Sequence, residues 1–118
     1  MVDQDITLSK WLHRYRLLIL ALLATFVFHS LLLFSVTYRG TYDAFVHIFF
    51  ADHYARAWWS LWETRWYTGF TMVSYPPLTH QLTALLSYPF SLPTGFIIVM
   101  ITSTVITTLG VYRFSRLW

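Results

Sequence analysis

The feature that most constrains this chain is a run of 20 residues without a formal charge, from Leu17 to Val36. A helix of 20 residues is about 30 Å long, which is the thickness of the hydrocarbon core of a bilayer. A secretory signal peptide would have a shorter apolar stretch that ends at a small-x-small cleavage site. Ser35-Val36-Thr37 is a poor cleavage site, so we expect residues 17–36 to form an uncleaved transmembrane helix.

The composition agrees with a membrane protein. Apolar residues make up 57% of the 118 positions and charged residues only 11%, whereas a soluble domain carries roughly 25% charged residues. The basic residues stand at the edges of apolar runs and form no continuous patch, so nucleic acid is not an expected partner. Cysteine is absent, which excludes disulfides and thiolate sites.

Charges around the first apolar run predict its orientation. Lys10, Arg14 and Arg16 precede it, whereas Arg39 alone follows it closely. Because basic residues favour the cytoplasmic side, we expect residues 1–16 to be cytoplasmic and residues 37–77 to form an extracytoplasmic loop.

The loop is expected to contain interfacial helices. No glycine or proline occurs between Asp43 and Trp66, which predicts one or two amphipathic helices over residues 43–66, lying on the outer membrane surface. The end of this stretch is rich in large amphipathic rings, which favour the headgroup level of a bilayer. These rings are Trp58, Trp59, Trp62, Trp66 and Tyr67.

Two apolar segments follow the loop. Residues 78–92 would be a short, marginal span, and residues 94–112 are a better one, followed by Arg113 and Arg116. If both segments cross, the C-terminus is extracytoplasmic and the two arginines break the charge rule. If they make one interrupted crossing, the C-terminus is cytoplasmic and the rule holds. The expected fold is therefore an all-α integral membrane protein with two to three transmembrane helices and amphipathic interfacial helices in its extracytoplasmic loop.

Short elements in the loop occur in a characteristic order. They are Tyr42-Asp43, His47, Trp66-Tyr67-Thr68-Gly69 and Tyr75-Pro76-Pro77-Leu78-Thr79-His80. This order resembles the N-terminal region of GT-C glycosyltransferases, such as the protein O-mannosyltransferases and aminoarabinose transferases. The resemblance implies a bacterial or archaeal plasma membrane and a polyprenyl-phosphate-linked sugar as donor. GT-C enzymes have more spans than this chain, so whether the native chain continues past Trp118 is left open.

The resemblance also assigns roles to residues. Asp43 would be the catalytic base, and the alternative is a helix N-cap. His47 lies four residues later, on the same helical face, and would contact substrate. The alternatives for the pair are a plain Asp–His hydrogen bond and a divalent cation on the donor phosphate, although two ligands are too few for a metal site. No resident cofactor is expected.

Three further residues are expected to bind substrate: Arg65, Tyr75 and His80. The guanidinium of Arg65 suits a phosphate, and the alternative is a lipid headgroup. His80 stands just inside an apolar segment, where polar side chains usually face a cavity or a partner helix. Asp52 and Arg56 are expected to form a solvated ion pair.

Two functions remain open. The chain is either the N-terminal part of a membrane glycosyltransferase that acts on the extracytoplasmic face, or a non-catalytic membrane subunit derived from such an enzyme. As 118 residues alone it is not expected to be active. In both cases the expected partners are the lipid bilayer and further transmembrane helices of the same or another chain.

Overall fold

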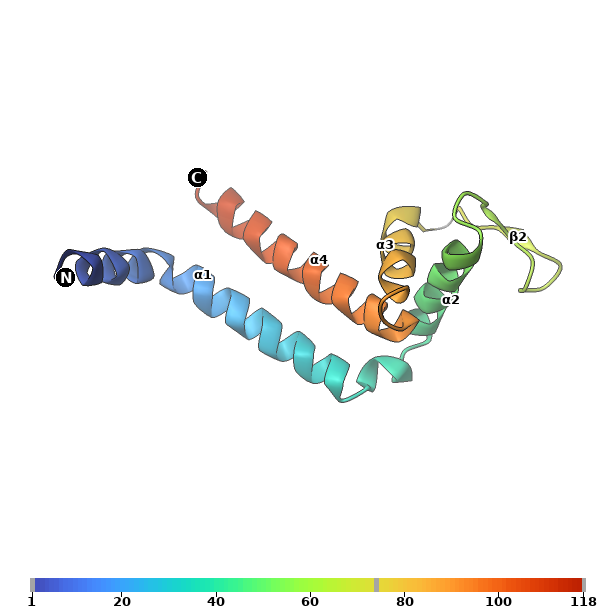
Figure 1. Cartoon of the computed structure of the whole chain (residues 1–118), viewed down its shortest axis with the longest axis horizontal. Helices are drawn as coiled ribbons and strands as arrows, with labels where there is room; N and C mark the ends of the chain where they lie inside the picture. The colour runs from blue at the N-terminus through green and yellow to red at the C-terminus, as the bar shows by residue number, and fades with distance from the viewer. Residues whose placement is uncertain (1, 74, 118) are drawn as a thin grey trace.

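The computed structural model describes residues 2–73 and 75–117, which fold mostly into helices (Figure 1). The elements are α1 (Val2–Phe34), a short 3₁₀ helix η1 (Thr37–Gly40), α2 (Tyr42–Arg56), strands β1 (Trp62–Glu63) and β2 (Phe70–Thr71), α3 (Pro77–Ser87) and α4 (Leu92–Ser115). Helices α1 and α4 run side by side in opposite directions, and α2, α3 and the strands gather at one end of this pair (Figure 1).

Two helices are long and apolar enough to cross a membrane, Lys10–Leu31 within α1 and Leu92–Ser115 in α4. They have 22 and 24 residues, which correspond to about 33 and 36 Å of helix. The expectation of a mostly helical chain with at least two such helices is confirmed. Helix α1 also extends further than expected, since it begins at Val2 rather than at residue 17.

The predicted short span over residues 78–92 is replaced by a helix that is too short to cross. Helix α3 has 11 residues, about 16 Å, roughly half the hydrocarbon thickness. It begins with Pro77 at its first position, where the missing N–H costs nothing. Ser91 then caps α4, and its hydroxyl accepts a hydrogen bond from the Thr94 N–H at 3.3 Å. Of the two helices that follow the hairpin, only α4 is therefore long enough to span the hydrocarbon core.

The predicted helix over residues 43–66 is wrong beyond Arg56. Instead, the chain turns and forms an antiparallel hairpin in which Trp62 pairs with Thr71 and Glu63 with Phe70. A continuous helix would separate His53 from Glu63 by about 15 Å, whereas the hairpin brings His53 Nδ1 within 2.9 Å of Glu63 Oε2. Aromatic and threonine residues also favour strands.

The hydrophobic core lies in the unit made by α2, α3 and the hairpin. Phe50 and Tyr54 from α2 pack with Met72 and Ala84, and all four are buried. Helix α4 joins this unit through Gly95, where an added Cβ would lie 2.8 Å from the Thr83 carbonyl oxygen. Most of α1 and α4 is outside this core and exposes large apolar side chains.

Helix α4 contains several threonines whose hydroxyls bond to their own helix. The hydroxyls of Thr104, Thr107 and Thr108 donate to carbonyls four residues earlier, at 2.8, 2.8 and 2.9 Å. The contact between α1 and α4 includes the hydroxyls of Thr25 and Thr108, 3.4 Å apart. These three hydroxyls are therefore satisfied within their own helix.

The hairpin turn depends on Gly69, whose φ is +96°. We expect Gly69→Ala to destabilise the hairpin by about 1–2 kcal/mol, because a positive φ is unfavourable for residues with a Cβ. The new Cβ would also lie 2.7 Å from the Trp62 ring. Hydrogen exchange of the Met72 amide, which donates to the Leu61 carbonyl, should accelerate. Gly40→Ala is the control, since its Cβ would meet no atom within 4 Å; equal acceleration in both variants would contradict the prediction.

Candidate functional site

A cleft of about 410 Å³ lies where the end of α1, η1 and the start of α2 meet α4. Its walls are mostly apolar or aromatic, with a few polar groups among them. The lining residues are His29, Thr37, Tyr38, Thr41, Asp43, Ala44, His47, Phe96 and Met100. Two of the residues singled out from the sequence, Asp43 and His47, thus lie in one cleft.

Asp43 stands in the first turn of α2, and the N-cap position belongs to Thr41. The alternative interpretation, in which Asp43 is the N-cap of this helix, is therefore wrong. Its exposed side chain forms no hydrogen bond or ion pair with any residue that the structure describes. A carboxylate at this position is favoured by the unsatisfied N–H groups of the helix start and remains accessible to a ligand.

His47 pairs with His80 rather than with Asp43. Its Nδ1 lies 2.9 Å from His80 Nε2, and the two rings stack with centroids 5.2 Å apart. The remaining hydrogen bond of His80 is with the backbone of Pro76, which has only a carbonyl to offer, so His80 donates there. A neutral His80 then accepts at Nε2 from the Nδ1–H of His47.

Tyr75 and His80 lie behind His47, away from the cleft. The Tyr75 ring packs edge-on against His47 with centroids 5.1 Å apart. His80 is only 3% exposed, and the space between it, Tyr54 and Phe50 is too small for a water molecule. A ligand in the cleft would therefore reach His80 only through His47.

Burial lowers the pKa of His80 from 6.5 to about 4, with a further contribution from the charge of His47 and an opposing one from the hydrogen bond to Pro76. Because the folded pKa is depressed, the stability that neutral His80 provides is present above pH 6.5 and is lost as the pH falls toward 4. The Nδ1–H of His47 consequently has a permanent acceptor at neutral pH, which holds the ring in place.

We expect acid to loosen the packing of α3 on α2. Between pH 6.5 and 4 the free energy of opening this unit should fall by about 3 kcal/mol, the equivalent of the pKa difference. Hydrogen exchange of the α3 amides, corrected for intrinsic rates, measures this loss. His80→Asn is the control, because it cannot titrate; if its acid sensitivity equals that of the unmodified chain, His80 is not the responsible group.

Arg65 lies in a different place, in an ion-pair network that closes the hairpin. Its guanidinium donates to Glu63 Oε1 and Oε2 at 2.8 and 2.6 Å and to Asp52 Oδ2 at 2.5 Å. Glu63 is 1% exposed and also bonds to His53. Asp52 forms the predicted ion pair with Arg56 as well. The structure therefore does not bring Arg65 together with Asp43.

His29, which lies inside the first apolar run, also lines the cleft but is not among the residues expected to bind substrate. Its Nδ1 donates to the Thr25 carbonyl at 2.9 Å, so a neutral ring has Nε2 free to accept at the cleft. The signal for it was present, since polar side chains in an apolar span usually face a cavity. Among the residues described, no group of three or more His, Asp or Glu residues is placed to hold a metal ion.

The cleft combines two imidazoles and a carboxylate that is unpaired among the described residues with aromatic walls from Tyr38 and Phe96. Carboxylates and imidazoles are the commonest proton acceptors in enzyme sites. Neither the known protein families nor the curated proteins and solved structures include a match to this chain. The site is therefore interpreted from its own geometry.

Proposed function

We propose that α1 and α4 cross a membrane, with the start of α1 and the end of α4 on the cytoplasmic side and with α2, the hairpin and α3 on the outer face. The basic residues that support this are Lys10, Arg14, Arg16, Arg113 and Arg116, which all lie toward the free ends of the two antiparallel helices. A single return crossing by α4 satisfies the charge rule for both helices. It also removes the conflict that two return crossings would create.

The exposed faces of α1 and α4 support lipid or further helices as neighbours. Leu17, Phe34 and Leu31 of α1 are 78, 81 and 66% exposed. Contiguous apolar surface of this kind is typical of membrane or protein contacts. We propose that lipid and further transmembrane helices, of the same or another chain, cover it.

For the chemistry, we propose the N-terminal part of a GT-C-type glycosyltransferase that uses a polyprenyl-phosphate-linked sugar. The observation that carries this is the position of Asp43, which has no partner among the described residues, in a cleft at the end of the helix pair next to α2. In the proposed reaction, Asp43 accepts the proton of an acceptor hydroxyl while that oxygen displaces polyprenyl phosphate with inversion. His47, held by His80 and Tyr75, would line the acceptor or donor site.

The test of this function is sugar transfer from polyprenyl-phosphate donors by membranes that contain the longest native form of the protein. Membranes lacking the protein provide the background. Transfer above background supports the enzyme. Absence of transfer with every donor, together with purification only within a larger assembly, supports the alternative of a non-catalytic subunit. In that case the exposed apolar faces of α1 and α4 would pack against other subunits.

The membrane placement has its own test, which the absence of native cysteine makes simple. Cysteines placed at Thr41 and Thr71, both exposed, should react with an impermeant maleimide in intact cells. A cysteine at Ser115 should react only after lysis, because α4 returns to the cytoplasmic side. Labelling of Ser115 in intact cells, or protection of both loop positions, would contradict the placement.

A further inference from the structure

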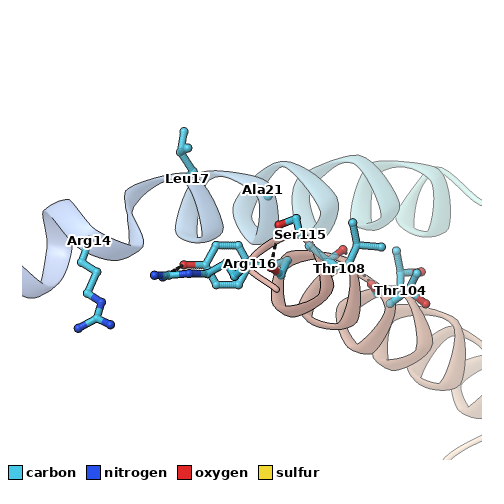
Figure 2. Close-up of a pocket in the computed structure, with 10 residues that line it drawn as sticks. Arg14, Leu17, Ala21, Thr104, Thr108, Ser115 and Arg116 are labelled. Carbon is cyan, nitrogen blue, oxygen red and sulfur yellow. Dashed lines mark hydrogen bonds between the residues drawn. The ribbon is translucent and has the colours of Figure 1, made fainter. Parts of the chain in front are cut away.

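A second groove, of about 780 Å³, separates α1 from α4 near the free ends of the two helices (Figure 2). Helix α1 contributes Arg14, Leu17 and Ala21, α4 contributes Thr108 and Val111 among others, and Arg116 follows directly after α4. The groove is far from the cleft that holds Asp43, and no lining residue is shared.

Two arginines lie at the end of this groove, and no carboxylate of the described residues pairs with them. Arg14 on α1 and Arg116 directly after α4 lie at the same end of the groove (Figure 2). The guanidinium of Arg116 donates to the Tyr112 hydroxyl at 3.1 Å, and that of Arg14 lies 5.7 Å from the centre of the Tyr15 ring. Neither arginine pairs with a carboxylate among the residues described, and none of the groove residues is acidic.

The walls beyond the arginines are effectively apolar. Leu17, Ala21 and Val111 supply hydrocarbon surface. Thr107 and Thr108 also line the groove, but their hydroxyls donate to carbonyls of α4 itself. An occupant of this groove therefore meets positive charge at one end and hydrocarbon along its length.

We propose that this groove binds an anionic phospholipid of the cytoplasmic leaflet. The lipid phosphate would lie between the two guanidinium groups, whose planar donors suit phosphate oxygens, and an acyl chain would lie along Ala21 and Val111. Basic pockets between transmembrane helices on the cytoplasmic side are a known mode of headgroup binding. The inference rests on the membrane placement proposed above and is independent of the transferase activity.

The test uses the full chain in detergent micelles and native mass spectrometry with phosphatidylglycerol or phosphatidylcholine as the added lipid. We expect phosphatidylglycerol to be retained preferentially. Arg14→Gln/Arg116→Gln should weaken its retention roughly 25-fold, from about fivefold for each arginine near an anionic headgroup. The matched control is Arg16→Gln/Arg113→Gln, which removes the same charge at the same end from residues that do not line the groove.

Ala21→Leu provides a second variant, since it fills the apolar part of the groove and leaves both arginines in place. It should also reduce retention, and circular dichroism in the same micelles should report unchanged helix content for every variant. The proposal is overturned if the control weakens retention as much as the groove variant, if phosphatidylcholine is retained equally, or if a second copy of the chain occupies the groove in place of lipid.

Discussion

Replacing Asp43 with asparagine is expected to lower sugar transfer roughly 100- to 10,000-fold, which is the usual contribution of a general base. Asparagine has nearly the same shape but cannot accept the proton of the acceptor hydroxyl. The substitution should leave the fold intact, because Thr41 and not Asp43 is the N-cap and the carboxylate has no partner among the described residues. The loss of helix-dipole stabilisation amounts to about 0.3–1 kcal/mol.

The measurement is transfer from a polyprenyl-phosphate sugar by the longest native form, with expression and donor binding followed in parallel. Asp52→Asn is the matched control, since it makes the same chemical change in an acid of α2 that does not line the cleft. His47→Ala should lower the rate of sugar transfer less than Asp43→Asn does. If a divalent cation takes part, a chelator should reproduce the effect of His47→Ala. Near-normal transfer by Asp43→Asn would exclude Asp43 as the base.

The second large effect is expected from Arg65→Met, which should destabilise the hairpin by about 3 kcal/mol. The variant leaves the carboxylate of Glu63 buried, at 1% exposure, with His53 as its remaining side-chain partner. A buried charge that loses its partner is costly, whereas exposed ion pairs contribute little. Arg65 also lies 4.7 Å from the centre of the Phe49 ring, and this contact would be lost as well.

Hydrogen exchange across residues 61–72 measures this effect and should accelerate about 100-fold, the equivalent of the lost stability. Arg56→Met is the control, because Arg56 pairs with the same Asp52 but its side chain is 55% exposed. Its expected cost is below about 1 kcal/mol. Similar acceleration in both variants would show that burial of Glu63 does not determine the stability of the hairpin.

The apolar helices could be predicted because their signal is local. The uncharged run after Arg16 is long enough for a span by itself, and no other element changes that conclusion. The same holds for the shared helical face of Asp43 and His47, which follows from their spacing of four residues and agrees with the position of both in one cleft. Such features depend on composition and on spacing of four residues, and both are visible in the chain.

The remaining features depend on contacts between distant positions. His47 and His80 are 33 residues apart, and the element that joins them is the packing of α2 on α3. The hairpin was not predicted because it is stabilised by a contact between distant residues. Its buried carboxylate, Glu63, bonds to His53 of α2. Burial of a charged residue cannot be inferred from its neighbours in the sequence, since it requires knowing which partners the fold brings to it.

The threonines of α4 bear on the order in which such a protein could be assembled. Because Thr104, Thr107 and Thr108 donate to carbonyls of their own helix, α4 needs no partner chain to satisfy these hydroxyls in hydrocarbon. With the membrane placement proposed above, such a helix can enter lipid before it packs against α1, and Thr108 keeps its bond to the Thr104 carbonyl while its oxygen lies 3.4 Å from the Thr25 hydroxyl. Insertion and association are thereby separable steps, as in the two-stage view of membrane protein folding.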